Sequence, residues 1–356
     1  MSFQRFVDEA VSEWMRGKGP KSDIVISSRV RIARNLQDYP FPLLATGEQA
    51  EEVLSHIEQT IKEAEEDAPF DHPEVIRMEQ LSELEKRVLV EKHLISPHLA
   101  EESSHGGVVL SGDESVSMMV NEEDHLRIQC LFPGFQLDQA WEIADRIDNW
   151  FEKRVTYAFH EKSGYLTSCP TNVGTGVRIS VMLHLPALAL TQQLPRLLQA
   201  ANQVGLAVRG IYGEGSEALG NLYQVSNQVT LGHTEAEIIE KLQGVVNQMI
   251  EQEQRARKRL LEARAIQLED RVYRSYGLLQ HARVMDSKEA MQRLSDIRLG
   301  IDLGLISHLQ GTIMNELMVM TQPGFLQQHA GEALDPEERD VRRAMIIRER
   351  LSIAQA

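Results

Sequence analysis

Alternating apolar and polar residues mark several short β-type segments in the first two thirds of the chain. Residues 22–35 carry Ile24, Ile26 and Val30 at alternating positions, which predicts a strand. Three shorter runs, G-G-V-V-L, S-V-S-M-M-V and H-L-R-I-Q-C-L-F, follow one another between residues 106 and 132 and predict a β-meander. Further strands are expected at 164–170, 177–186, 206–215 and 221–228.

Apolar residues at helical spacing occupy the segments between these strands and nearly all of the chain beyond residue 234. Helices are expected at 3–16, 46–66, 82–94, 137–155, 194–205, 234–265, 268–284, 287–305 and 335–351. The predicted fold class is therefore α+β: an antiparallel β-sheet with flanking helices over 1–255, followed by an all-helical domain over 256–356. Because the amphipathic helices of the second domain need apolar partners, we expect it to form a homodimer.

Composition and charge limit the classes of partner. The 356 residues are 42% hydrophobic and carry a net charge of −16. This charge disfavours direct binding to nucleic acid or an anionic membrane and favours a cationic partner. Two cysteines form no disulfide framework, the N-terminal segment lacks the apolar core of a signal peptide, and no apolar run spans a bilayer. A cytoplasmic protein is expected.

An unusual acidic stretch, N-E-E-D-H-L-R at 121–127, interrupts the predicted meander. Glu122, Glu123 and Asp124 stand side by side between two β-type segments, although like charges repel and acids are poor strand residues. The stretch is either a solvated hairpin turn or a site that receives a cationic group.

Arginines recur within or at the ends of the predicted strands, at Arg29, Arg31, Arg127, Arg178 and Arg209. Residues two apart in a strand face the same side, so Arg29 and Arg31 present two guanidinium groups together. Any one of them could be a solvated strand arginine. Convergence of all five would suit a triphosphate, since the guanidinium fork matches phosphate oxygens.

Two glycine-containing loops complete the candidate chemistry. The loop S-C-P-T-N-V-G-T-G-V-R at 168–178 carries Cys169, and R-G-I-Y-G-E-G-S-E at 209–217 places glycines on both sides of Glu214. A buried structural thiol and an ordinary acidic turn are the alternatives. The chain contains no P-loop, no protein-kinase motif set and no Cys/His set at zinc spacing.

Taken together, these pieces resemble the guanidino (phosphagen) kinase family, the creatine and arginine kinases. S-S-R-V-R, N-E-E-D-H-L-R, C-P-T-N-V-G-T-G-V-R and R-G-I-Y-G-E-G-S-E match the family's motifs in the family's order, over roughly residues 22–255. The resemblance implies the guanidino kinase/glutamine synthetase-like catalytic fold and an ATP-dependent phosphotransferase that uses Mg²⁺, with no protein metal ligand.

The resemblance also implies roles for individual residues. The catalytic group would be Glu123 and Glu214, which grip the acceptor guanidinium, with Cys169 beside it. Glu123 is the expected base, although the sequence alone does not separate it from Glu122. The ATP site would consist of Ser27, Ser28, Arg29, Val30, Arg31, His93, Arg127, Arg178, Ile179, Ser180, Val181, Met182, Arg209, Gly210, Ile211, Tyr212, Gly213 and Glu214.

Departures from the small-molecule kinases indicate a particular branch. Few residues precede Ser27, Gly215 replaces a family histidine, and the helical region after residue 255 has no counterpart. This combination resembles the bacterial protein arginine kinases, which share an R-D-x-x-R-A motif, present here as R-D-V-R-R-A at 339–344. By that resemblance Arg339, Asp340, Arg343 and Ala344 would form an allosteric phosphoarginine-binding pocket. A charged helix face is the alternative.

The expected function is therefore an ATP-dependent protein arginine kinase, with a role in the stress response. The resemblance implies a heat-shock repressor and misfolded proteins as substrates, a Clp-type protease machinery as a partner, and an activator protein. The alternatives are a kinase of free arginine or another small guanidine, and a non-catalytic phosphoarginine-binding adaptor.

Overall fold

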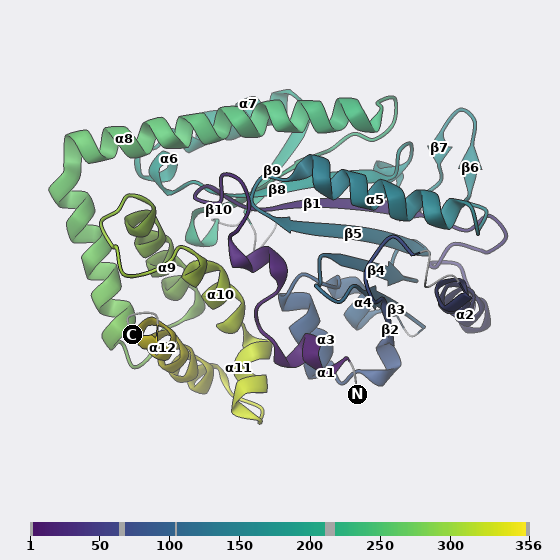
Figure 1. The fold of residues 1–356 in the computed structure, drawn as a ribbon, viewed down its shortest axis with the longest axis horizontal. Helices are drawn as coiled ribbons and strands as arrows, with labels where there is room; N and C mark the ends of the chain where they lie inside the picture. Colours follow the sequence, from purple (N-terminus) through teal and green to yellow (C-terminus); the bar gives the residue numbers. More distant parts are fainter. Residues whose placement is uncertain (1–2, 64–67, 104, 211–217, 354–356) are drawn as a thin grey trace.

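The central feature of the computed structural model is one eight-stranded antiparallel sheet (Figure 1). The model describes residues 3–63, 68–103, 105–210 and 218–353. The strand order is β2-β3-β4-β5-β1-β8-β10-β9, with a separate hairpin of β6 and β7. The bounds are β1 Val25–Arg34, β2 Glu74–Arg77, β3 Gly107–Leu110, β4 Val116–Val120, β5 Leu126–Pro133, β6 Phe159–His160, β7 Gly164–Tyr165, β8 Val177–His184, β9 Leu206–Gly210 and β10 Leu222–Asn227. The predicted meander is confirmed as β3-β4-β5.

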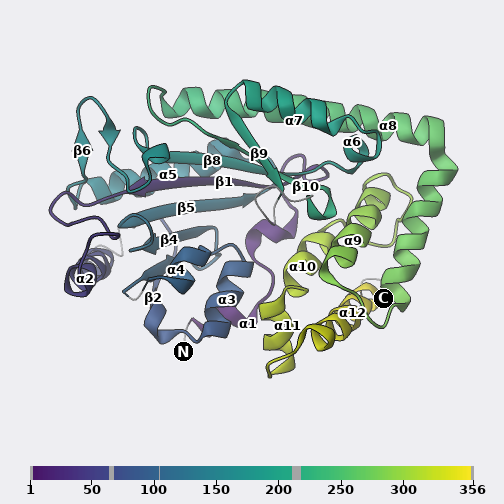
Figure 2. The ribbon, with the colours of Figure 1, turned by 180° about the vertical axis from the view of Figure 1, so that it is seen from behind.

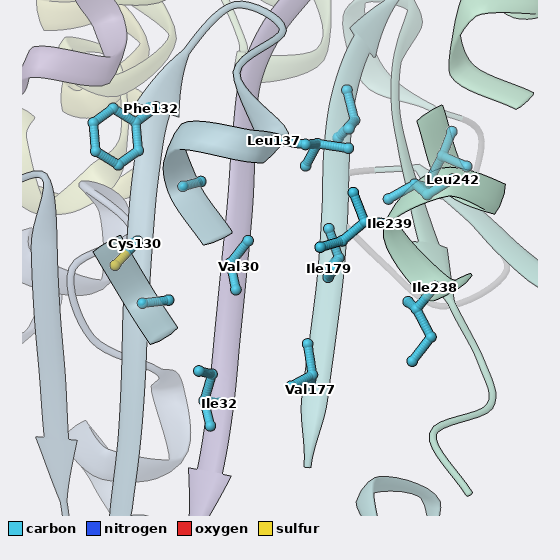
Figure 3. Close-up of a cluster of buried hydrophobic side chains, with 14 of the residues drawn as sticks. Val30, Ile32, Cys130, Phe132, Leu137, Val177, Ile179, Ile238, Ile239 and Leu242 are labelled. Carbon is cyan, nitrogen blue, oxygen red and sulfur yellow. The ribbon is translucent and has the colours of Figure 1, made fainter. Parts of the chain in front are cut away.

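The two faces of the sheet differ because alternate residues of each strand point to opposite sides. One face is apolar and packs under α5 (Leu137–Glu152) and the first half of α8 (Glu235–His281). Figure 3 shows Val30, Ile32 and Ile179 from the strands beneath Leu137 and Leu242 from these two helices. The opposite face carries the polar side chains of the same strands, so the apolar core fixes which residues are left for a site.

Of the remaining helices, α6 and α7 lie beside α8, whereas α1, α2, α3 and α4 lie on the lower side in both views (Figures 1 and 2). Their bounds are α1 Gln4–Asp8, α2 Gly47–Glu63, α3 Glu83–Glu91, α4 Pro97–Glu101, α6 Pro186–Leu190 and α7 Leu194–Gln203. The C-terminal region adds α9 Ser287–Asp302, α10 Thr312–Met320, α11 Pro323–Ala330 and α12 Pro336–Ile353. The predictions did not resolve β2, α4, α6, α10 and α11, which are short elements with weak periodicity.

The long element α8 contains two of the predicted helices. Residues 234–265 and 268–284, expected as two helices, form the two halves of α8, which are separated by a kink at Arg264, where φ is −144° and ψ is 41°. Figure 1 shows α8 crossing the sheet and then turning down beside α9 and α12. No break in the helix marks residue 255, and the domain boundary there stays a prediction.

The N-terminal segment is also different from the prediction of one helix over 3–16. It forms α1 and a short 3₁₀ helix, Glu13–Arg16, with Glu9 in an extended conformation between them. The reason is the buried side chain of Lys92, whose ammonium donates to the carbonyl oxygens of Phe6 and Glu9 at 2.8 Å each. This buried cation favours a backbone in which the carbonyls of Phe6 and Glu9 both point at one ammonium group, which the extended conformation at Glu9 allows.

Lys92→Met is expected to destabilise the protein by about 3–5 kcal/mol, because Lys92 also pairs with the buried carboxylate of Glu114 at 2.5 Å. The substitution leaves that carboxylate and two carbonyls without a cation. Thermal unfolding and the rate of proteolysis within the first sixteen residues of the chain measure the effect. The control is Lys258→Met on the exposed face of α8, which should change neither. Unchanged stability in Lys92→Met would contradict this role.

Candidate active site

All five strand arginines lie on the face of the sheet that is opposite to the apolar core. Arg31 of β1 stands opposite Arg178 of β8 on one side and Gln129 of β5 on the other, and Arg127 is two residues from Gln129. On the far side of β8, Gln224 of β10 pairs with Met182 and with Arg209 of β9. Directly opposed residues share a face, so the register alone brings the guanidinium groups together.

Four of the arginines line one cavity of about 430 Å³. They are Arg31, Arg127, Arg178 and Arg209, and Glu123, Cys169 and Gln224 also line it. Arg29 lies beside this cavity, where its Nη2 donates to Gln224 Oε1 at 3.0 Å and its Nε donates to Ser180 Oγ at 3.3 Å. A smaller pocket around Arg29 is lined by Ser27, His93, Met182 and Trp14.

The arginine cluster is held at an electrostatic cost. Burial and the charges of Arg178 and Arg127 lower the pKa of Arg29 to about 10, and burial with the neighbouring arginines lowers the pKa of Arg31 well below its ordinary value. Burial and Arg209 also lower the pKa of Arg178. Among the described residues, the Nε of Arg31 has no hydrogen-bond partner. Such a set of cations favours a polyanionic ligand.

The turn between β4 and β5 separates the two glutamates that the sequence left equivalent. Glu122 is buried, accepts from Ser96 Oγ at 2.6 Å and receives Arg127 Nη1 at 2.7 Å. The side chain of Glu123 is 45% exposed, and its Oε2 lies 2.8 Å from Arg127 Nη2. Glu122 is thus a structural anchor, whereas Glu123 can reach a ligand. The turn is therefore not a simple solvated hairpin, and Glu123 remains available to a cationic ligand.

Other residues of the same turn hold the surrounding loops in place, a role that sequence analysis missed. Asn121 donates to the carbonyl of Ala50 in α2 at 2.7 Å. Asp124 is fully buried and accepts from the backbone N–H of Ser168 at 2.7 Å. Burial raises the pKa of Asp124. The motif therefore ties α2 and the cysteine loop to the sheet.

His125 performs the same task for the segment that follows β1. Its Nδ1 accepts from the backbone N–H of Leu36 at 3.0 Å, and its Nε2 lies 3.0 Å from the carbonyl of Pro40. Burial lowers the pKa of His125 to about 4, so the ring is neutral, with Nε2 as the donor to Pro40.

Cys169 lies at the junction of two cavities. It lines the arginine cavity and also a second cavity of about 500 Å³, which is lined by Glu122, Glu123, Glu102 and His98. Among the described residues, Glu123 and Cys169 alone are shared by both sets of lining residues. One cavity is thus basic, the neighbouring one is acidic, and the predicted base and thiol lie where they meet. Cys169 Sγ is 3.0 Å from Thr171 Oγ1.

Not every residue of the predicted ATP site faces the arginines. Val30, Ile179 and Val181 are buried in the apolar core on the other face, so only their backbones belong to the site strands. Ser28 also faces away, and its hydroxyl donates to the carbonyl of Gly134 at 2.8 Å. Gly210 ends β9. Ile211, Tyr212, Gly213 and Glu214 lie outside the described residues. Gln224, which the prediction omitted, contacts Arg29 and lines the cavity.

His93 follows α3 and lines the smaller pocket together with Arg29. Burial and the charge of Arg29 lower the pKa of His93 to about 4. Its ring lies 5.5 Å from that of Trp14, and its backbone carbonyl accepts from Gln129 at 2.8 Å. No local pattern in the sequence pointed to Trp14, because its hydrogen-bond partner, the carbonyl of Lys92, is more than seventy residues away.

The R-D-V-R-R-A motif lies on α12, far from this site in both views (Figures 1 and 2). Arg343 is 3% exposed, donates to the carbonyls of Thr321 and Met285 and pairs with Asp340. Ala344 is buried, and Arg339 donates to the carbonyl of Leu334. The motif is thus a folded junction of α12 with its neighbours rather than an exposed charged face.

The described part of the chain shows neither a metal-binding cluster nor a helix that could span a membrane. Within it, no group of three His, Cys, Asp or Glu side chains could hold a metal ion. No described helix has the length and hydropathy to cross a membrane.

Buried neutral histidines should make stability depend on pH. The pKa of His125 falls from 6.5 to about 4 on folding, so the unfolded chain binds its proton first. Stability is then complete above pH 6.5 and is lost as the pH falls toward 4, by up to about 3 kcal/mol for this residue. His125→Gln should flatten that part of the curve of unfolding free energy against pH. The exposed control His329→Gln should not. An equal slope in both variants would contradict the assignment.

Solved structures with a similar fold include a lombricine kinase and a taurocyamine kinase. A lombricine kinase superposes with a TM-score of 0.59 at 22% identity, covering 72% of this chain and 71% of that one. The duplicated taurocyamine kinase of Schistosoma mansoni with transition-state analogue components superposes with a TM-score of 0.59 at 22% identity, covering 75% of this chain and 38% of that one. The predicted fold class is confirmed: this is a phosphagen kinase fold with an added helical region.

Sequence comparison defines the family more closely. Residues 52–256 match the model of the ATP:guanido phosphotransferase C-terminal catalytic domain, and residues 265–356 match that of the protein-arginine kinase McsB C-terminal domain. A protein-arginine kinase of Halalkalibacterium halodurans is 63% identical, with 99% of each chain covered. One of Brevibacillus brevis is 62% identical over all of this chain and 99% of its own length. The chain belongs to the protein-arginine kinase family.

Proposed function

We propose that this protein transfers the γ-phosphoryl group of ATP to arginine side chains of other proteins. The observation that carries the proposal is the meeting of a basic cavity and an acidic cavity at Glu123 and Cys169. ATP occupies the basic cavity, and the acceptor arginine enters through the acidic one. The relatives named protein-arginine kinase support the choice of acceptor.

The acceptor chemistry requires a carboxylate at this junction. A guanidinium with a pKa near 13.8 has no free lone pair, and full deprotonation at pH 7 would cost about 9 kcal/mol. Glu123 therefore accepts the proton from the attacking nitrogen while the N–P bond forms and the bond from phosphorus to the ADP oxygen breaks. Glu214 serves as the second carboxylate grip in the prediction. Cys169 lies beside the guanidinium and forms no covalent intermediate.

The arginines supply electrostatic stabilisation to the transferring group. Arg31, Arg127 and Arg178 donate to phosphate oxygens and offset charge in a loose transition state. Arg127 Nη2 donates to Glu123 Oε2 at 2.8 Å. A bound phosphate competes for that guanidinium and leaves the carboxylate free to act as the base.

Magnesium fits this site as a companion of the nucleotide. The described residues offer no three-ligand protein cluster, and Mg²⁺ is commonly held by substrate phosphates and water with few protein ligands. When bound, the ion neutralises charge on the phosphates. The protein groups that hold and orient the nucleotide remain the arginines.

The deciding experiment measures transfer from γ-labelled ATP with Mg²⁺ to an arginine-rich protein and, in parallel, to free arginine. Acid-labile label on the protein alone supports the proposal, because a P–N bond hydrolyses in acid. Label on free arginine alone would identify a small-guanidine kinase. Label on neither, with the activator candidates of the same organism present, would support a non-catalytic adaptor.

Regulation by phosphoarginine is a further part of the proposal, at Arg339, Asp340, Arg343 and Ala344. Asp340→Ala should retain basal transfer but change its response to added phosphoarginine. The variant also leaves Arg343 buried without its carboxylate, so it should unfold at a lower temperature. Glu349→Ala, at an exposed position of the same helix, is the control. Normal phosphoarginine binding by Asp340→Ala would refute the regulatory role.

The stress-response setting, the heat-shock repressor and misfolded-protein substrates, the Clp-type protease, the activator, the homodimer and the cytoplasmic location stay predictions from the resemblance.

A further inference from the structure

One exposed leucine lines the acidic cavity, and a second exposed leucine follows it in the chain. Leu43 is 86% exposed and Leu44 is 78% exposed, and Leu43 lines the cavity together with Glu102 and Glu123. Single exposed apolar residues are common, but two adjacent leucines that are almost fully exposed beside a functional cleft are not.

These leucines are held in place and are not part of a loose loop. The carbonyl of Phe41 accepts from the backbone N–H groups of Leu44 at 2.8 Å and Ala45 at 3.0 Å, which closes a turn. His125 anchors the start of the turn through Pro40, and its ring meets that of Phe41 edge-on at 6.3 Å. A fixed apolar surface loses little entropy on binding, which favours recognition.

The anchoring residue connects this turn to the catalytic motif. His125 is two residues from Glu123 in the turn between β4 and β5, so the leucines keep a set position relative to the predicted base. Leu43 and Glu123 line the same cavity. An extended peptide whose arginine reaches Glu123 therefore places its neighbouring residues against the leucines.

The charge of the acidic cavity favours the same ligand, an extended peptide that contains an arginine. Glu102 is largely exposed at the rim and Glu123 lies at the inner end, so a cationic side chain is favoured inside. An apolar side chain next to the arginine in sequence finds Leu43 and Leu44 outside. Free arginine would interact with the acidic cavity but would leave Leu43 and Leu44 without a role.

We infer that Leu43 and Leu44 form a specificity surface that selects extended polypeptide segments in which an apolar residue neighbours the target arginine. The inference rests on the proposed function and adds the local sequence of its substrate. Segments of this composition are buried in most folded proteins, so the surface favours chains that expose them.

The test compares two short peptides that contain one arginine each, flanked by leucine in the first and by glycine in the second. The wild-type protein should phosphorylate the leucine-flanked peptide with a kcat/KM on the order of tenfold higher, because burial of one leucine side chain has about this effect. The difference should lie in KM, since the contact is equal in the ground state and the transition state.

The double variant Leu43→Ser with Leu44→Ser should reduce that ratio to near one. The matched control is Ile266→Ser, at a position of α8 that is 78% exposed and away from the cleft, which should preserve the ratio. General damage to the enzyme would lower both rates and leave their ratio unchanged.

The outcomes separate the two hypotheses. Equal rates for the two peptides in the wild type, or an unchanged ratio in the double variant, would overturn the specificity surface while leaving the kinase proposal intact. Label on neither peptide, in the presence of label on an arginine-rich protein, would also overturn it. Absence of label on every acceptor would refute the proposed function itself.

Discussion

Glu123→Gln is expected to lower kcat for phosphoryl transfer by roughly 10²–10⁴-fold, the usual contribution of a positioned general base. The amide keeps the size of the side chain and one oxygen that can accept a hydrogen bond, but it cannot take up the guanidinium proton. Transfer of label from ATP to protein arginine, measured in single turnover, isolates this step from product release.

ATP binding should survive the same substitution or become tighter. Glu123 lines the arginine cavity and carries a negative charge. Its Oε2 accepts a hydrogen bond from Arg127 Nη2 at 2.8 Å. Removal of that charge leaves Arg127 more available to phosphate. A nucleotide titration of the variant therefore separates a loss of chemistry from a loss of binding.

Two matched variants make the result specific. Glu102→Gln changes an exposed carboxylate at the rim of the acidic cavity and should leave kcat within a few-fold of wild type. Glu122→Gln removes the buried partner of Arg127 and Ser96 and should lower the unfolding temperature, which Glu123→Gln should not do. Wild-type kcat in Glu123→Gln would refute its assignment as the base.

Arg31→Met should have opposite effects on activity and stability. Arg31 lies between Arg29, Arg127 and Arg178, and its lowered pKa reflects burial and their repulsion. Methionine keeps the unbranched chain and removes the charge. We expect transfer to fall by roughly 10²–10³-fold, as for other lost donors to a transition-state anion, while the unfolding temperature of the nucleotide-free protein rises.

The control for this prediction is a buried arginine with carboxylate partners. Arg257 pairs with Glu253 at 2.9 Å and with Asp302 at 3.3 Å, so Arg257→Met should destabilise the protein. Thermal unfolding with and without ATP measures both variants. A lower unfolding temperature for nucleotide-free Arg31→Met would contradict the view that the cluster is held at an electrostatic cost for a polyanion.

Local pattern predicted the elements that form the site. Strand alternation fixed Val30 as a core residue and Arg29 and Arg31 as neighbours on the opposite face, because side chains alternate along any strand. The β3-β4-β5 meander was also visible locally. The sequence resemblance then supplied the family, which the comparisons confirm.

Local pattern failed where distant contacts decide the conformation. Lys92 breaks the predicted N-terminal helix from more than eighty residues away, and no short window of sequence contains both groups. By contrast, the kink of α8 at Arg264 agrees with the local pattern, which predicted that one helix ends at residue 265 and the next begins at residue 268.

The stretch N-E-E-D-H-L-R shows most clearly what the sequence determines and what only the tertiary structure decides. Because its three acidic residues are adjacent in the sequence, their carboxylates must lie in the same turn. The sequence does not decide which carboxylate is free. Only the fold buries Glu122 against Arg127 and Ser96, encloses Asp124 under Ser168 and leaves Glu123 at the junction of two cavities. Burial and pairing are properties of residues distant in sequence, and they determine the chemistry of otherwise equivalent groups.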